Sequence, residues 1–365
     1  MSQTVYIHIP FCKRICYYCD FCRQVYQEQL ADRYIITLQN EIEANLSINE
    51  TYQTFYIGGG TPSSLSIKQL VRLLEILKPY QRDVAEYTIE CNPEDLIDEK
   101  IEILRCFGIN RISIGVQSSS NKLLKSVNRM HTFRDVHEGI LRLHKQGIYN
   151  ISVDLIYGLP SQSMEDWIQA LQDVSKLDIQ HISLYSLTIE PNSVFGKKGI
   201  QKIDDDLEAD MYEYTIRFLI ENGYKQYEVS NFCKDNSESR HNFAYWKYDD
   251  FIGLGVGASG KEKHYRYTNT SNIKEYISSF KTKEYYHLNR SEQIFEYVMM
   301  NLRTTEGILL QHFNDVYGIS FLDYFKNEID ILLEKELIEF DEMNSRINCK
   351  KMILLNEVLL QFLNI

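Results

Sequence analysis

Four cysteines stand close together near the start of the chain, with the spacing Cys12-x3-Cys16-x2-Cys19-x2-Cys22. A structural zinc site would use all four thiolates in a closed tetrahedron, whereas a redox dithiol would use one Cys-x-x-Cys pair at the start of a helix. An iron–sulfur cluster would use three cysteines on one loop and leave one iron open. A chance group of buried thiols is a weak fourth alternative, and spacing alone does not separate zinc from iron–sulfur.

An open iron on a low-potential cluster would have a specific chemical use. It could chelate the amine and carboxylate of S-adenosylmethionine (SAM) and pass one electron to the neighbouring sulfonium. Cleavage of SAM would then give a carbon radical that abstracts unreactive hydrogen atoms. The cofactor carries such chemistry, and the protein supplies position and shielding.

Composition restricts the other possibilities. The chain has 365 residues, of which 44% are hydrophobic and 25% charged, as in ordinary soluble globular proteins. The net charge of −12 argues against a nucleic-acid partner. No signal peptide or apolar run of membrane-spanning length is visible, so we expect no transmembrane segment and a cytoplasmic location, with peripheral membrane contact left open. Disulfides are disfavoured in that compartment, and tight cysteine groups there are typical of metal-binding or catalytic sites.

The elements that must position the cysteines are short strands alternating with helices. Helical spacing is clear at 26–46 and 66–80. Six strand–helix repeats predict a parallel sheet with right-handed crossovers, which would form an incomplete (β/α)6 barrel, open on one side. The six expected strands are 5–9, 54–60, 86–90, 111–117, 151–158 and 181–188.

Polar or glycine residues mark the carboxyl ends of these strands, where barrels of this kind place their chemistry. They are Cys12, Gly58, Gly59, Gly60, Thr61, Glu90, Gln117, Asp154 and Thr188. This location favours iron–sulfur over zinc, because a structural zinc gains nothing from the catalytic end of a barrel.

The pattern changes after about residue 200. An acidic helix is expected at 204–224, and the glycine-rich 251–260 predicts a tight turn or a close approach of backbones. Helices dominate from 292, including 321–338, and 350–355 is a candidate β-wing. We therefore predict an α/β protein: a partial (β/α)6 barrel at 1–200, an extension at 201–290 and a small, mainly helical, winged-helix-like domain at 291–365.

Ordered motifs resemble a known family. Cys12-x3-Cys16-x-Tyr18-Cys19 resembles the cluster signature of radical-SAM proteins, and YIHIPFC, YIGGGTPSSL, RISIGVQS, SVDLIYGLP and HISLYSLTIEP follow in order. The set is similar to the oxygen-independent coproporphyrinogen III oxidases (HemN) and, more closely, to their relatives, the HemW haem chaperones. YEVSNF, RHNFAYW, GLGVGASG and NLRTTEGI extend the resemblance over nearly the whole chain.

The resemblance implies roles for individual residues. Cys12, Cys16 and Cys19 would ligate a [4Fe-4S] cluster, and Arg129 could hold a carboxylate with two hydrogen bonds. The residues expected to contact SAM are Tyr6, Tyr18, Gly59, Gly60, Thr61, Glu90, Gln117, Arg129 and Asp154.

Two departures favour the haem chaperones over the oxidases. Phe21 stands where the oxidases have a further cysteine, with Cys22, a candidate bystander, one step later, and the first strand begins at residue 5 without the oxidases' N-terminal arm. The segment RHNFAYW resembles the HNxxYW motif associated with haem in that subgroup. His241 is then the candidate axial ligand, with Tyr245 and Trp246 packing on the porphyrin, although a lone histidine is more often a hydrogen-bonded structural residue.

The sequence thus predicts a haem chaperone that binds a [4Fe-4S] cluster, SAM and haem, and transfers haem to an acceptor protein, with an unidentified electron donor. A homodimer and enzymatic turnover are left open. One alternative is a coproporphyrinogen III dehydrogenase that oxidatively decarboxylates propionate side chains. Another is a zinc-stabilised binding module without redox chemistry.

Overall fold

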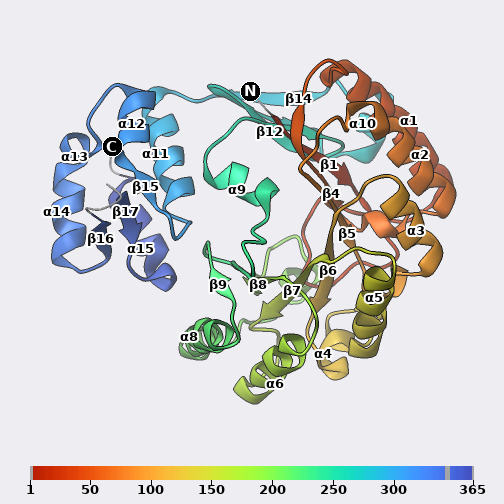
Figure 1. The fold of residues 1–365 in the computed structure, drawn as a ribbon, viewed down its shortest axis with the longest axis horizontal. Coiled ribbons are helices and arrows are strands. Elements are labelled where there is room, and N and C mark those ends of the chain that lie inside the picture. The colour runs from red at the N-terminus through yellow and green to blue at the C-terminus, as the bar shows by residue number, and fades with distance from the viewer. Residues whose placement is uncertain (1–2, 342–345, 364–365) are drawn as a thin grey trace.

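A wide, curved sheet organises the protein (Figure 1). The computed structural model describes residues 3–341 and 346–363. Over these residues the strands form a twelve-stranded sheet in the order β14-β13-β12-β11-β1-β4-β5-β6-β7-β8-β10-β9. Its six parallel central strands confirm the predicted set. They are β1 (Gln3–Ile9), β4 (Tyr52–Gly59), β5 (Glu86–Cys91), β6 (Arg111–Gln117), β7 (Asn150–Tyr157) and β8 (His181–Ser186).

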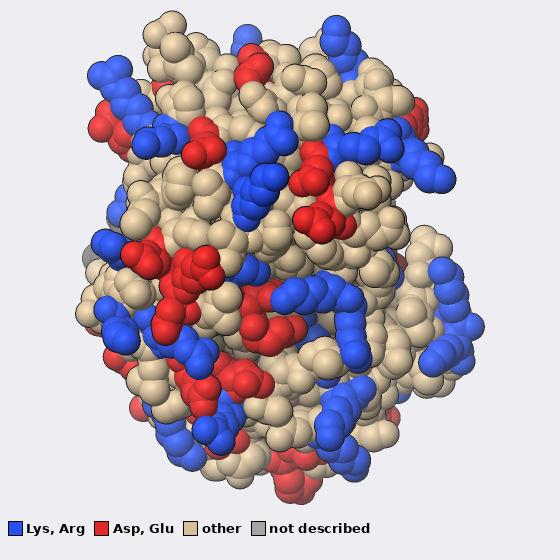
Figure 2. Space-filling model, turned by 90° about the vertical axis from the view of Figure 1, so that its right-hand side faces the viewer, with Lys and Arg blue, Asp and Glu red and all other residues tan. Residues whose placement is uncertain are grey.

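Helices cover the convex face of this sheet (Figure 1). They are α1 (Glu28–Asn45), α2 (Ile67–Leu77), α3 (Asp98–Cys106), α4 (Asn121–Ser126), α5 (Phe133–Lys145), α6 (Met164–Ser175) and α8 (Asp205–Glu221). Ser66, Thr132 and Ser163 begin three of them with capping boxes, which satisfy the free N–H groups of the first turn. Figure 2 shows positive and negative side chains interspersed over this outer face, without a field of one sign.

The strands are apolar toward the helices and polar toward the concave side. In β6, Ile112, Ile114 and Val116 are fully buried in the main core. The alternate residue Ser113 hydrogen-bonds Asp154 of β7 on the opposite face. Successive strand residues point to opposite faces, so one face packs under the helices and the other presents polar groups. A polar inner face suits a bound cofactor, unlike the packed apolar interior of an ordinary barrel.

The sheet is wider than the six strands predicted. Residues 251–260, expected as a turn, contain β11 (Phe251–Leu254), which pairs in parallel with β1. The chain continues through β12 (Ser259–Glu262), β13 (Tyr265–Asn269), α10 (Ile273–Ser278) and β14 (Lys283–His287). At the other edge, β10 (Asn231–Cys233) and β9 (Lys225–Gln226) run antiparallel. A Cβ on Gly253 would lie 1.8 Å from the carbonyl oxygen of Ser259, so the expected close approach is present as well.

One helix, α9 (Arg240–Trp246), lies on the concave side (Figure 1). The buried carboxylate of Glu86, at the start of β5, accepts the backbone N–H groups of Arg240 (2.9 Å) and His241 (3.0 Å). The start of α9 is thereby fixed to the floor of the sheet.

The C-terminal region has a separate core that includes Phe313, Phe321 and Phe325. Its elements are α11 (Arg290–Asn301), β15 (Ile308–Leu309), α12 (Leu310–Tyr317), α13 (Phe321–Tyr324), α14 (Lys326–Glu334), β16 (Ile338–Asp341), β17 (Arg346–Cys349) and α15 (Leu355–Gln361). The mainly helical expectation is confirmed, and the division at 200 and 290 stays a prediction.

Two details of the C-terminal prediction were wrong. The wing is the pair β16 and β17, whereas Met352–Leu354 forms a 3-10 turn. The helix expected at 321–338 is divided at Phe325, which is fully buried in the core, and Ile338 already belongs to β16. Among the described residues, none of the helices combines the length and the apolar character that a membrane span needs.

Candidate cluster and SAM site

The cysteine loop is closed at its base by two short strands. β2 (Phe11–Cys12) and β3 (Gln24–Val25) pair in parallel, and the N–H of Tyr26 donates to the carbonyl of Cys12 (2.9 Å). Cys12 is 7% exposed, and Cys16 and Cys19 are half-buried. The chain between Cys12 and Gln24 is therefore a compact loop that follows β1 in the sequence and lies at the carboxyl ends of the strands.

The glycine-rich turn after β4 lies against this loop. The N–H groups of Gly60 and Thr61 donate to the carbonyls of Ile9 (2.9 Å) and Phe11 (2.8 Å), and the hydroxyl of Thr61 lies 3.6 Å from Sγ of Cys12. A Cβ on Gly60 would lie 2.7 Å from the carbonyl carbon of Pro10 and 3.0 Å from that Sγ. Glycine is needed here because any side chain would push the cysteine loop away.

The segment after α4 holds the other side of the loop. Nδ2 of Asn128 donates to the carbonyl of Ile15 (2.8 Å). The guanidinium of Arg129 donates to Oδ1 of Asn92 (3.0 Å) and to the carbonyl of Gly115, and it lies 3.7 Å from Sγ of Cys16. A fixed positive charge thus stands beside the thiol of Cys16.

Three of the thiols lie on one loop, as a three-cysteine iron–sulfur cluster would need. Burial raises the pKa of Cys12 to about 12, with smaller contributions in the same direction from Cys19 and Cys16, so the three thiols are neighbours. Within the described ranges, no three His, Cys, Asp or Glu side chains are already arranged around the position of one ion. A cluster needs no such arrangement because its thiolates bind different irons. The thiol of Cys22 instead donates to the carbonyl of Ser271 (3.4 Å).

Glu90 joins the glycine turn to the inner face of the sheet. Its carboxylate accepts hydrogen bonds from the hydroxyl of Tyr56 (2.8 Å) and the N–H of Gly59 (3.0 Å). Burial raises the pKa of Glu90 to about 7, and Asp154 adds to the rise. Gly59 has φ +112°, and a Cβ there would strike the ring of His8 at 2.4 Å, so only glycine fits.

His8 connects Tyr6 to the end of the cysteine loop. Its Nε2 lies 2.7 Å from the carbonyl of Cys22, and its Nδ1 lies 2.9 Å from the hydroxyl of Tyr6. A carbonyl only accepts, so Nε2 carries the proton and Nδ1 accepts from Tyr6. Burial lowers the pKa of His8, which keeps the ring neutral in this role.

Gln117 and Asp154 lie along the same inner face as Glu90. The missing side chain of Gly115 makes room for both Arg129 and Gln117, whose terminal nitrogens lie 2.8 and 3.0 Å from where its Cβ would be. Burial raises the pKa of Asp154. Tyr18 packs into a small apolar cluster with Leu123, Val127 and Phe195. β8 ends at Ser186, so Thr188 lies just past the strand end predicted for it.

The predicted haem residues lie in two different surroundings. The ring of His241 is 1% exposed and stacks on Tyr56 at 4.9 Å. Its Nδ1 and Nε2 lie 2.8 Å from the hydroxyls of Thr54 and Tyr245. Burial lowers the pKa of His241 to about 3. Trp246, by contrast, lies under the guanidinium of Arg303, 5.9 Å from the ring, with its Nε1 buried and unpartnered.

The sequence interpretation missed His8, Tyr56, Asn92 and Asn128. The first three lie on or directly after inner-face strand positions, where a polar residue alternates with buried apolar ones, so strict period-two counting would have found them. Asn128 has no such signal. It lies after α4 with φ +65°, and only tertiary structure brings it to Ile15.

Comparisons with known proteins agree with the fold. Residues 6–174 match the Radical SAM superfamily, and residues 288–351 match the HemN C-terminal domain. A heme chaperone HemW of Lactococcus lactis subsp. lactis (strain IL1403) is 39% identical, over 99% of this chain and 97% of its own. Another of Bacillus subtilis (strain 168) is 36% identical, over 99% of each chain. The solved structure of Escherichia coli coproporphyrinogen III oxidase (HemN) superposes with a TM-score of 0.86 at 24% identity, covering 99% of this chain and 90% of its own.

The radical-SAM fold, the C-terminal domain and the full-length relatives lead to one assignment. This chain belongs to the HemW family within the radical SAM superfamily.

Proposed function

We propose that the protein is a haem chaperone that carries a [4Fe-4S] cluster and SAM, binds haem, and transfers it to an acceptor protein. The observation that carries the proposal is the full-length similarity to relatives named heme chaperone HemW. Phe21, in place of a further cysteine of the oxidases, supports the same choice. The proposal also includes a cytoplasmic location, assembly as a homodimer and an electron donor that reduces the cluster.

Cys12, Cys16 and Cys19 would hold the cluster, which supplies one-electron chemistry to a bound SAM. Gly59, Gly60 and Thr61 would present backbone groups to SAM, and Glu90 would accept a hydrogen bond from it. The remaining contacts to SAM would come from Tyr6, Tyr18, Gln117, Arg129 and Asp154. In the guanidinium of Arg129, Nε has no partner and Nη2 donates only to the carbonyl of Gly115, so N–H groups on two nitrogens remain for a carboxylate.

Haem ligation by His241 would require one rearrangement. Nδ1 could keep its proton and donate to Thr54, which leaves the lone pair of Nε2 for iron once the hydroxyl of Tyr245 moves away. Tyr245 and Trp246 would then pack against the porphyrin.

Anaerobic purification with a joint assay of iron, sulfide and haem, before and after SAM is added, tests the proposal. We expect a brown protein absorbing near 400 nm that binds haem and changes spectroscopically with SAM. A colourless zinc-loaded protein would contradict it. Rapid formation of protoporphyrinogen from coproporphyrinogen, SAM and a reductant would support the dehydrogenase alternative instead.

A further inference from the structure

Two helices flank the cysteine loop, α4 and the short α7 (Val194–Lys197). The N–H of Tyr17, on the loop, donates to the carbonyl of Val127 at the end of α4 (3.2 Å). The carbonyl of Tyr17 accepts from the N–H of Phe195 in α7 (2.9 Å). Directly after α7, Nζ of Lys198 lies 5.0 Å from the centre of the Tyr17 ring. The loop, α4 and α7 therefore form one continuous surface around the thiols expected to hold the cluster.

This surface is positively charged although the protein is acidic. Residues 12–25, 120–130 and 193–199 contain eight Lys or Arg and one acid, Asp20, whereas the whole chain has a net charge of −12. The outer helices, by contrast, carry both signs interspersed (Figure 2). The positive field beside the cysteine loop is therefore a local feature that the overall composition does not explain.

Most of these cations have no partner within the protein. Lys13 is an exception, because it pairs with the buried carboxylate of Asp95, which Lys100 also approaches at 3.9 Å. The basic surface consists of the exposed cations that form no ion pair with any described residue, namely Arg14, Lys122, Lys125, Lys197 and Lys198. Their charge is available to the carboxylates of a partner.

Exposed apolar side chains lie among the cations. Phe21 is on the cysteine loop, two residues after Cys19, and its side chain is 66% exposed. Met130 is 55% exposed and directly follows Arg129, whose guanidinium contacts Cys16. Apolar side chains inside a polar, charged rim are the usual anatomy of an interface between proteins.

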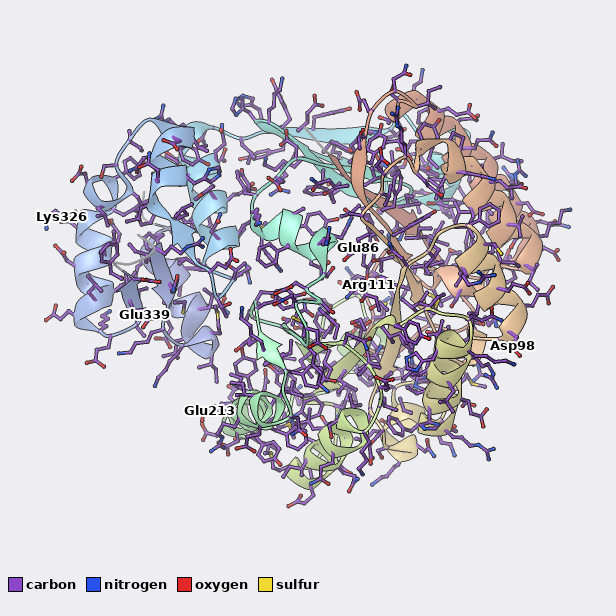
Figure 3. The ribbon with its side chains drawn as sticks, viewed as in Figure 1. Glu86, Asp98, Arg111, Glu213, Lys326 and Glu339 are labelled. Atoms are coloured by element: carbon purple, nitrogen blue, oxygen red, sulfur yellow. The ribbon has the colours of Figure 1, made fainter. Side chains whose placement is uncertain are left out.

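The position of this surface indicates which partner it would serve. Cys16 and Cys19 are only half-buried, so a cluster bound to them would lie close to the protein surface on this side. A cluster that reduces SAM must itself receive an electron from outside the chain, and this side offers a short route. The predicted haem residues lie elsewhere, on α9, which is held by Glu86 near the centre of the molecule (Figure 3).

We propose that the basic surface is the docking site of the electron donor, and that this donor is an acidic carrier protein of low reduction potential. The inference rests on the proposed function, which includes a donor but gives it neither a binding site nor a charge. Carboxylates of the carrier pair with the lysines at α4 and α7, and its apolar surface packs on Phe21. The carrier is oxidised by one electron and the cluster is reduced by one electron, with no bond formed or broken. Complementary charge of this kind speeds encounter and is weakened by salt.

Binding of an oxidised plant-type ferredoxin, an acidic one-electron carrier, to the full-length protein tests the site. Lys122→Glu combined with Lys197→Glu should weaken binding roughly tenfold or more at about 0.05 M salt, and the difference should largely disappear at about 0.5 M salt. Lys78→Glu combined with Lys145→Glu is the matched control. It makes the same change of charge at exposed positions where α2 and α5 end, which is the opposite end of the strands, and should leave the affinity unchanged.

The rate of cluster reduction is a second measurement. In anaerobically loaded protein, reduced ferredoxin should reduce the cluster of the Lys122→Glu, Lys197→Glu variant roughly tenfold more slowly than that of the wild type. Dithionite, a small reductant that needs no docking site, should reduce both at the same rate. Unchanged iron and sulfide content and an unchanged thermal midpoint exclude misfolding as the cause of a loss.

Three outcomes would overturn the inference while the proposed function stands. In one, wild-type protein that loads a cluster and responds to SAM shows no salt-dependent binding of the ferredoxin. In another, the basic-surface variant and the control lose affinity equally, which would reflect net charge alone. In the third, the variant loses affinity for single-stranded RNA and keeps its affinity for ferredoxin, which would assign the surface to nucleic acid. Wild-type protein that takes up no cluster would instead contradict the proposed function itself.

Discussion

The cysteine thiols of the N-terminal loop differ in their surroundings. Cys12 contacts Thr61 and Cys16 contacts Arg129, whereas Cys22 contacts the backbone of Ser271 on the sheet extension. We therefore expect Cys12→Ala, Cys16→Ala and Cys19→Ala to abolish cluster loading, and Cys22→Ala to retain it. Iron and sulfide content after anaerobic reconstitution measures the effect. Equal loss in all four variants would restore the four-thiolate zinc alternative.

Glu90 is the residue through which pH should act on SAM binding. Its folded-state pKa of about 7 lies above the usual 4.5 because the group is buried, so the carboxyl is protonated below pH 7 and ionised above it. Ionised Glu90 would attract the cationic ligand. SAM affinity should therefore rise between pH 6 and pH 8 by up to about tenfold, since one pKa unit corresponds to a factor of ten.

Glu90→Gln is the matched variant for this pH effect, because the amide keeps the size of the side chain and cannot ionise. Calorimetric titration with SAM at both pH values should give a flat profile for the variant. A pH dependence that survives the substitution would assign the effect to another group.

At the scale of elements, the turn after β4 positions the cluster loop. A methyl group on Gly60 has no room beside Pro10 and Cys12, so Gly60→Ala should reduce cluster loading severely. Gly147→Ala is the control. Its added Cβ meets nothing within 4 Å, and its φ of +82° alone should cost about 1 kcal/mol of folding free energy. Full loading in Gly60→Ala would show that the turn does not hold the loop.

The elements show what the sequence could and could not predict. Strands such as 111–117 and 151–158 were found because β-branched runs between capped helices are a local signal. β11 was missed because Gly253 interrupts its apolar pattern and Gly255 follows it. The small size of Gly253 is explained by Ser259 of the next strand, and that of Gly255 by Tyr34 and His8, which are distant in sequence. The cysteines were identified by spacing.

At the scale of the whole molecule, Glu228 stands where the sheet meets the C-terminal region. Residue 228 forms an isolated bridge with Thr304, and the N–H groups of Val229 and Thr305 donate to the carbonyls of Arg303 (2.9 Å) and Tyr227 (3.0 Å). The carboxyl itself is fully buried, with Oε1 unpartnered. Burial raises the pKa of Glu228 to about 7, against which the charge of Arg303 acts only weakly. The junction therefore contains an acid that is more stable protonated.

This junction predicts a specific pH dependence of stability. The pKa of Glu228 is about 7 in the folded state and near 4.5 in the unfolded state. The protonated carboxyl therefore contributes to the free energy of unfolding in full below pH 4.5, and this contribution is lost as the pH rises through 7. The loss corresponds to roughly 3 kcal/mol. Glu228→Gln cannot ionise and can still accept from the N–H of Ser230. Its thermal midpoint should exceed that of the wild type at pH 8 and approach it at pH 5, while the exposed control Glu221→Gln follows the wild type. A variant that is destabilised equally at both pH values would show that Glu228 is held ionised by Arg303, and that charge pairing, rather than a neutral acid, joins the C-terminal region to the sheet.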